Sequence, residues 1–242
     1  MGGETGDRSS PRAMVLLLHG LGRTPVSLRR MARAIEAHGF RTLNLAYPTR
    51  TLGLGGLIDF VRGRLQEVER PDDVLPVLHG VGHSLGGVVL RALLADPPPP
   101  WRAGRLVTIA SPHRGARVVA PLLRSRAVCR WFGPVLADLA WESSALQACA
   151  IGGCGAVEVG AIFGARRFQP FVPAAWINAR LGLREVTDGT VEAESACGAP
   201  WWPAFADCVE VRCGHTFIAA DAEVIRQTVA FLSNGRFDHA GG

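Results

Sequence analysis

A serine set between two glycines, where a strand-like run meets a helix-like run, most restricts what this chain can fold into. The motif is Gly82-His83-Ser84-Leu85-Gly86, with an apolar run at 76–81 before it and a helical pattern at 88–94 after it. A turn this tight strains its central residue and brings the flanking positions so close to neighbouring elements that only glycine fits there. The turn therefore presents the Ser84 hydroxyl above a sheet and leaves the Leu85 amide at a helix N-terminus.

The strand and helix around this motif argue against a simpler interpretation. In a chain with 29 glycines, the pattern Gly-x-Ser-x-Gly also arises as a glycine-rich turn whose serine caps the next helix. That alternative does not explain why an apolar run ends at the motif and a helical pattern starts after it.

Apolar runs alternate with amphipathic stretches along the chain, which predicts an α/β fold with a mostly parallel six-stranded sheet and helices on both faces. The strand-like runs lie at 14–18, 40–46, 76–81, 105–110, 156–163 and 208–213. The helical patterns lie at about 25–38, 57–69, 88–95 and 222–232. We expect one domain over 13–235, a disordered leader at 1–12 and a loose tail at 236–242.

The composition excludes several classes of protein. An apolar content of 48% excludes disorder. The formal charge of +5 comes entirely from arginine, and only 114–130 forms a loose basic cluster, so we expect no nucleic-acid partner. Residues 1–12 lack the pattern of a signal peptide, and no apolar run is long enough to span a bilayer. A cytoplasmic protein is the expectation.

The six cysteines do not form a metal-binding pattern, because no Cys-x-x-Cys pair and no zinc-like spacing with histidine occur. We expect buried free thiols and leave open a bridge between Cys149 and Cys154 or between Cys197 and Cys208. There is also no nucleotide-binding loop. The sequence therefore predicts no metal and no other cofactor.

Four polar or glycine-rich segments directly follow predicted strands, and the ends of parallel strands meet at one edge of a sheet. They are the Gly20-Leu21-Gly22 loop, Ser84, the 111–115 segment and His215. A serine hydroxyl needs a base to take its proton, and histidine suits this near neutral pH. We choose His215, which lies in a polar loop after the last strand, and His113 is its competitor.

The base needs an acidic partner, and Asp188 is our choice. Its short side chain lies on a glycine-defined turn, Val186-Thr187-Asp188-Gly189-Thr190-Val191, between the fifth and sixth strands. The competitors are Glu185, Glu192, Glu194 and Asp207. An Asp-Gly pair is often no more than a turn, so the alternatives stay open. The chosen set gives the chain order Ser, Asp, His.

An oxyanion intermediate needs hydrogen-bond donors. We assign the backbone amides of Leu85 and Leu21, because the glycines around Leu21 allow a close backbone approach. The candidate substrate-binding residues are Gly20, His83, Trp131 and Trp141. The two tryptophans lie in an apolar, helical stretch at 116–150, which we interpret as a helical cap or lid. Ordinary packing of these helices on the sheet is the alternative.

Together these motifs resemble those of α/β-hydrolases of the lipase and esterase type. The matching residues are His19-Gly20-Leu21-Gly22, Gly82-His83-Ser84-Leu85-Gly86-Gly87, Ser111-Pro112-His113-Arg114-Gly115, Asp188-Gly189 and Gly214-His215-Thr216. The resemblance implies Ser84 as nucleophile, His215 as base and Asp188 as acid. It also implies a reduced form of the fold, without the two usual opening strands. The second strand of the chain would then lie at one edge, beside the first, with the third to sixth following in order.

The resemblance predicts a serine hydrolase that cleaves carboxylic esters through an acyl-enzyme. Two alternatives remain: an acyltransferase or thioesterase that uses the same side chains, and a hydrolase-fold protein used only for binding. The expected partner is a small-molecule ester or lipid, and a transient contact with a lipid surface stays open. The sequence does not predict an oligomeric state.

Overall fold

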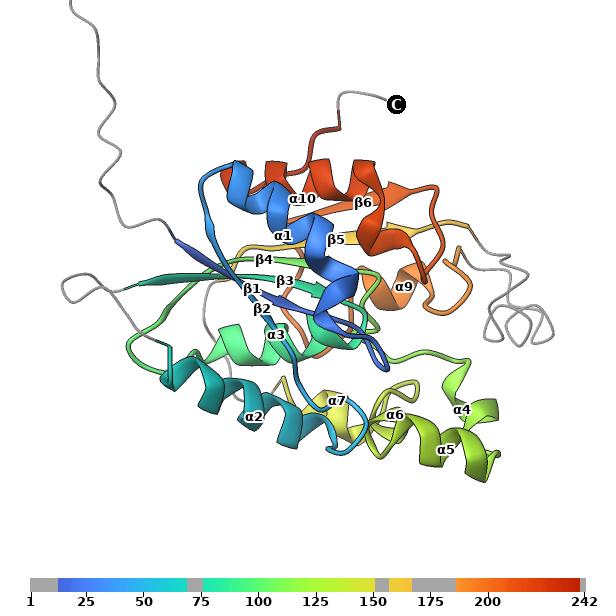
Figure 1. The fold of residues 1–242 in the computed structure, drawn as a ribbon. Helices are drawn as coiled ribbons and strands as arrows, with labels where there is room; N and C mark the ends of the chain where they lie inside the picture. Colours follow the sequence, from blue (N-terminus) through green and yellow to red (C-terminus); the bar gives the residue numbers. More distant parts are fainter. Residues whose placement is uncertain (1–12, 69–75, 151–156, 167–185, 240–242) are drawn as a thin grey trace, which may run out of the picture.

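The computed structural model describes residues 13–68, 76–150, 157–166 and 186–239. Within them, six strands form one sheet in the order β2-β1-β3-β4-β5-β6, and every neighbouring pair is parallel (Figure 1). The strands are β1 (Met14–Leu18), β2 (Arg41–Leu45), β3 (Val77–His83), β4 (Arg102–Ile109), β5 (Val159–Gly164) and β6 (Asp207–Val211). The predicted parallel sheet and its strand order are confirmed.

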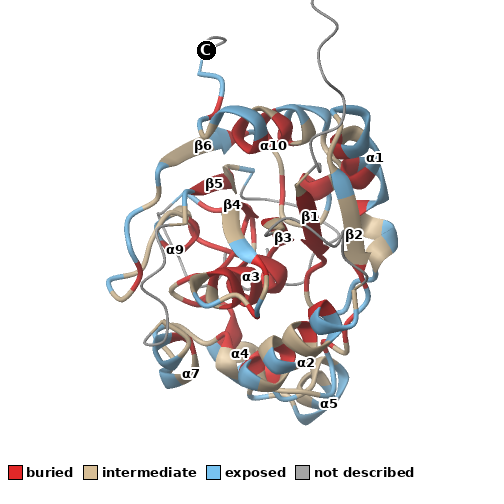
Figure 2. Cartoon of the chain, turned by 90° about the vertical axis from the view of Figure 1, so that its left-hand side faces the viewer, coloured by how far each residue is buried: buried red, intermediate tan, exposed pale blue. Residues whose placement is uncertain are grey.

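Helices cover both faces of the sheet (Figures 1 and 2). One face carries α1 (Arg29–Ala37), preceded by the 3-10 turn η1 (Pro25–Leu28), and α10 (Ala222–Asn234), preceded by η2 (Ile218–Ala220). The other carries α2 (Leu54–Gln66) and α3 (Leu85–Ala95), which share a second apolar core with the helices that follow β4. The short helix α9 (Ala193–Ala196) lies between β5 and β6 in the chain.

The interior strand β1 shows why the chain adopts this layering. All five of its residues are apolar and all five are buried. A strand needs such a continuous apolar sequence when helices cover both faces of its sheet. The edge strand β2 is only partly buried and carries polar side chains at Arg41, Thr42 and Asn44. This contrast is the one expected between a strand inside the sheet, β1, and a strand at its edge, β2.

Helix α2 begins at Leu54, three residues before the predicted start. Its N-cap residue is a glycine without a capping side chain, and the Leu54 amide donates instead to the Asp138 carboxylate at 2.7 Å. Such a bond satisfies one of the amides that a helix start leaves unpaired. Asp138 is 84 residues away in sequence, so local pattern could not reveal this cap.

Residues 116–150 form four short helices below the carboxyl edge of the sheet (Figure 1). They are α4 (Val119–Leu122), α5 (Arg126–Phe132), α6 (Val135–Asp138) and α7 (Ser144–Ala148). The segment packs closely on the body: a Cβ added to Gly133 would lie 1.9 Å from the Arg50 carbonyl oxygen. The helical character is as expected, and opening of this segment as a lid stays a prediction.

The chain end differs from the expected loose tail over its described part, 236–239. Phe237 is buried with its ring 4.9 Å from that of Phe231, and its amide donates to Asp207 at 2.8 Å. Apolar burial and this bond hold the tail on the body. The predicted leader lies outside the described residues. At the start of α10, the Asp221 carboxylate accepts the amides of Glu223 and Val224.

The described cysteines are all free thiols, at positions 129, 149, 197, 208 and 213. Cys197 and Cys208 are nonetheless neighbours, since a hydrogen bond between the two thiols raises the pKa of Cys197 and lowers that of Cys208. Cys154, the other member of the first bridge left open, lies outside the described residues.

Candidate active site

Ser84 occupies the turn between β3 and α3 in a strained conformation, with φ 54° and ψ −122°. Its amide donates to the Ile109 carbonyl of β4 at 2.9 Å, which ties the turn to the sheet. A Cβ on Gly82 would lie 2.3 Å from the Gly87 nitrogen, and one on Gly86 would lie 2.1 Å from the Leu18 oxygen. The predicted requirement for glycine on both sides of the serine is confirmed.

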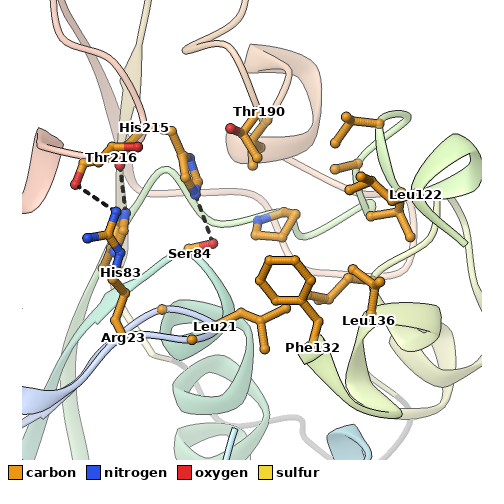
Figure 3. Close-up of a pocket in the computed structure, with 18 of the residues that line it drawn as sticks. Leu21, Arg23, His83, Ser84, Leu122, Phe132, Leu136, Thr190, His215 and Thr216 are labelled. Atoms are coloured by element: carbon orange, nitrogen blue, oxygen red, sulfur yellow. Dashed lines mark hydrogen bonds between the residues drawn. The ribbon is translucent and has the colours of Figure 1, made fainter. Parts of the chain in front are cut away.

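The side chains of Ser84, His215 and Asp188 form a continuous chain of hydrogen bonds. His215 Nε2 lies 3.1 Å from Ser84 Oγ, and His215 Nδ1 lies 2.7 Å from Asp188 Oδ2 (Figure 3 shows the first of these bonds). A carboxylate only accepts hydrogen bonds, so Nδ1 carries the proton and Nε2 is left to accept from the hydroxyl. The sequence predicted that these three residues would converge, and the structure brings them together.

Several backbone contacts fix Asp188 in place. Its Oδ1 accepts the amides of Thr190 and Val191 at 2.9 and 2.8 Å, and its carbonyl accepts the His215 amide at 3.1 Å. The carboxylate is 1% exposed. A Cβ on Gly164, at the end of β5, would lie 2.7 Å from the Asp188 Cβ, so this glycine makes the space that Asp188 fills. The sequence analysis missed the role of Gly164.

The competing residues have other partners or surroundings. His113 is completely buried against Phe205, with ring centroids 5.3 Å apart, and neither of its ring nitrogens has a hydrogen-bond partner among the described residues. Glu194 pairs with Arg114 and Arg117. Asp207 binds His239 at the opposite end of the sheet from Ser84. Glu192 is buried, and Glu185 lies outside the described residues.

The two amides assigned to an oxyanion hole lie on either side of the serine. Leu85 is the first residue of α3, where an amide has no intrahelical partner. The glycine loop carries Leu21, and this loop approaches the serine closely, because a Cβ on Gly20 would lie 3.2 Å from the Ser84 Cβ. Among the described residues, neither amide donates a hydrogen bond to the protein. Both remain available for a negatively charged oxygen.

His83 lines the cavity beside Ser84, but its ring also supports the neighbouring loop. His83 Nε2 donates to the His215 carbonyl at 3.1 Å. The His83 ring therefore holds the backbone of His215 in place. Burial, together with the charges of His215 and Arg23, keeps the pKa of His83 well below its usual value. The ring is therefore neutral. The sequence analysis assigned His83 to substrate binding and did not identify this contact.

A cavity of about 330 Å³ opens beside Ser84 and is lined mainly by apolar side chains. Leu122, Phe132 and Leu136 from the helices after β4 point into it (Figure 3). Gly20 and Trp131, both assigned to substrate binding, line it as well, and Trp131 is 63% exposed. Trp141 does not line it: the guanidinium groups of Arg114 and Arg117 lie over its ring at 4.9 and 3.6 Å. The sequence could not distinguish these two tryptophans, since both lie in apolar stretches.

The described residues hold no cluster of three or more histidine, cysteine, aspartate or glutamate side chains that could bind a metal ion. Over the same residues, no helix has the length and the apolar character needed to cross a membrane.

Acid should destabilise the fold below about pH 6.5, because four histidines are buried. Burial lowers the pKa of His19, lowers that of His79 to about 4, and places those of His83 and His113 well below their usual value. The unfolded chain therefore binds more protons than the folded protein in this range, so stability falls as the pH falls. Each histidine contributes up to about 1.4 kcal/mol per pH unit.

Urea unfolding between pH 7 and 5 measures how steeply the free energy of unfolding changes with pH, and His113→Phe is the informative variant. It replaces a ring without a described hydrogen-bond partner by an apolar ring. It should therefore reduce the slope of the unfolding free energy against pH by the contribution of one histidine. An unchanged slope in this variant would contradict the prediction.

Comparison with known proteins identifies the fold. No family model matches the chain, and no curated protein matches it in sequence. Among solved structures, it is similar to the mature lipase BlEst2 of Bacillus licheniformis, with a TM-score of 0.65, 13% identity and coverage of 87% of this chain and 88% of that one. A metagenomic carboxyl esterase gives a TM-score of 0.63 at 18% identity, over 86% of this chain and 65% of that one.

A third similar structure is an extracellular α/β-hydrolase from a Paenibacillus species, with a TM-score of 0.53, 15% identity and coverage of 91% of this chain and 97% of that one. The matches span most of the lipase and the Paenibacillus protein, but only about two thirds of the metagenomic esterase. At these identities the likeness defines the fold alone. The chain has the α/β-hydrolase fold, as the sequence motifs indicated.

Proposed function

We propose that the protein is a serine hydrolase that cleaves carboxylic esters through an acyl-enzyme, with Ser84 as nucleophile, His215 as base and Asp188 as its acidic partner. The observation that carries the proposal is the chain of hydrogen bonds from Ser84 Oγ to the buried Asp188, beside a largely apolar cavity. The names of similar structures, a lipase and a carboxyl esterase, are in keeping with this chemistry.

The first half of the reaction forms the acyl-enzyme. Ser84 Oγ attacks the ester carbonyl carbon while its proton passes to His215 Nε2. Asp188 stabilises the imidazolium that results and keeps the ring in the required tautomer. The amides of Leu21 and Leu85 stabilise the negative oxygen of the tetrahedral intermediate, and such a donor typically contributes about 3 kcal/mol to lowering the barrier.

The first half ends when His215 gives this proton to the departing alcohol, which leaves the acyl group on Ser84. In the second half, water attacks the acyl carbon while His215 takes a proton from it. His215 then returns the proton to Ser84 Oγ as the bond between Oγ and the acyl carbon breaks, and the carboxylic acid leaves. An alcohol or a thiol in place of water would give acyl transfer through the same residues. Hydrolysis is the simpler proposal, and product analysis with a competing alcohol distinguishes the two.

A fluorophosphonate probe tests the proposal, because it reacts covalently with an activated serine. We expect the wild-type protein to be labelled and Ser84→Ala to be unlabelled. Ser27→Ala is the matched control, since Ser27 does not line the cavity and, within the described part of the chain, its hydroxyl bonds only the Thr24 carbonyl. An unlabelled wild-type protein, or equal labelling of the Ser84→Ala protein, would count against the assignment.

The substrate class proposed is a small ester or a lipid ester, because the cavity wall is apolar. Contact with a lipid surface remains a prediction, to which the exposed Trp131 at the cavity and the exposed Phe217, next to the cavity residue Thr216, give some support. A cytoplasmic location likewise remains a prediction.

A further inference from the structure

The cavity beside Ser84 has two chemically different ends. Leu122, Phe132 and Leu136 lie on one side of the serine, and Arg23, His83 and Thr216 lie on the other (Figure 3). No aspartate or glutamate is among the described residues that line the cavity. With His83 held neutral by burial, the Arg23 guanidinium is the permanent charge at the polar end. An ester bound across Ser84 would place its two halves in different surroundings.

The loop that carries Leu21 also places Arg23. The Arg23 amide donates to the Gly20 carbonyl at 3.1 Å, which closes the turn, and one guanidinium nitrogen lies 3.4 Å from the Thr216 carbonyl. This is the one side-chain hydrogen bond that Arg23 makes with the described residues, and it forms no ion pair with them. A guanidinium has five N–H donors in a planar fork, so most of them face solvent or a ligand.

The reaction geometry decides which half of the substrate meets Arg23. His215 must protonate the departing alcohol, so the alcohol half lies beside His215 Nε2. Thr216 follows His215 directly, and Arg23 is hydrogen-bonded to Thr216. The acyl half then extends the other way, among the apolar side chains. The charge of Arg23 reaches this part of the site, since it contributes to lowering the pKa of His83.

We propose that Arg23 is a specificity-determining residue that favours esters whose alcohol half carries an anionic group, such as a phosphate, while the acyl chain lies against Leu122, Phe132 and Leu136. The inference rests on the proposed ester hydrolysis. A guanidinium binds a phosphate or carboxylate through two parallel hydrogen bonds, which orient the anion in addition to attracting its charge. Because Arg23 is exposed, we expect it to raise kcat/KM for the anionic ester relative to the neutral ester by about tenfold. This factor corresponds to the lower end of the range for a hydrogen bond to a charged group.

Two esters with the same acyl chain provide the test: 1-octanoylglycerol and 1-octanoylglycerol 3-phosphate, both below the concentration at which they aggregate. Arg23→Ala should lower the phosphate-to-neutral ratio of kcat/KM about tenfold, mainly through KM of the phosphate ester. Arg23→Lys should keep part of the preference, since it keeps the charge and loses the fork. High salt should lower the ratio in wild type more than in Arg23→Ala.

Arg30→Ala is the matched control, because Arg30 is also exposed and also bonds one backbone carbonyl, that of Ala220, but does not line the cavity. Its ratio should equal that of wild type. An unchanged ratio in Arg23→Ala, with both esters cleaved and Ser84 still labelled by a neutral fluorophosphonate, overturns the role of Arg23 alone. If neither ester is cleaved and Ser84 is not labelled, the proposed hydrolase function fails with it.

Discussion

Replacing His215 by alanine is expected to lower kcat for ester hydrolysis by about 10⁶-fold, and replacing Asp188 by asparagine by about 10⁴-fold. Without His215, no described side chain within hydrogen-bond distance can take the Ser84 proton. An asparagine at 188 can offer its N–H to His215 Nδ1 and so favours the wrong tautomer, which leaves Nε2 protonated. The two losses should not add in the double variant, because both act on one proton transfer.

Steady-state hydrolysis of a soluble ester measures these losses, and Asp207→Asn is the matched control. Asp207 also forms an Asp–His pair, with His239 Nε2 at 2.9 Å, but at the opposite end of the sheet. Its substitution should leave kcat within a few-fold of wild type. Activity in the His215→Ala protein near that of wild type would contradict the assigned base. A large loss in Asp207→Asn would show that the Asp188 effect reflects folding.

Features with a local physical cause were predictable from the sequence. The apolar run of β1 requires cover on both faces. The turn at Ser84 requires glycine on both sides, because an added Cβ would lie 2.1 or 2.3 Å from a backbone atom. The convergence of Ser84 and His215 also followed from local pattern, because each comes directly after a parallel strand. Asp188 was harder to assign, since an Asp-Gly turn has the same sequence whether or not its carboxylate faces a histidine.

Features that depend on long-range contacts were not predictable. The Asp138 cap of α2, the space that Gly164 leaves for Asp188 and the bond from His83 to the His215 carbonyl each join residues far apart in the chain. Trp141 has the apolar neighbours expected of a cavity residue, yet two arginines cover it. The tail at 236–239 looked loose because only Phe237 is strongly apolar, and its partner Phe231 belongs to the preceding helix.

Substituting alanine for Gly86 is expected to lower the free energy of unfolding by at least about 3 kcal/mol, a large fraction of what a domain of this kind possesses. The new Cβ would lie 2.1 Å from the Leu18 oxygen and 2.6 Å from its carbonyl carbon. Both are backbone atoms of the buried strand β1, so no side-chain rotation can relieve the contact. The strand and α3 must separate, and this moves Ser84 away from the Leu21 loop.

The matched control is Gly55→Ala, because Gly55 is the second residue of α2 as Gly86 is the second residue of α3. A Cβ on Gly55 would meet no atom within 4 Å. Alanine there should leave stability unchanged or raise it by up to about 1 kcal/mol, because it reduces the freedom of the unfolded chain. Urea unfolding followed by circular dichroism compares the two variants. Equal midpoints would mean that α3 and β1 do not approach as closely as described, and the geometry proposed for the oxyanion site would lose its support.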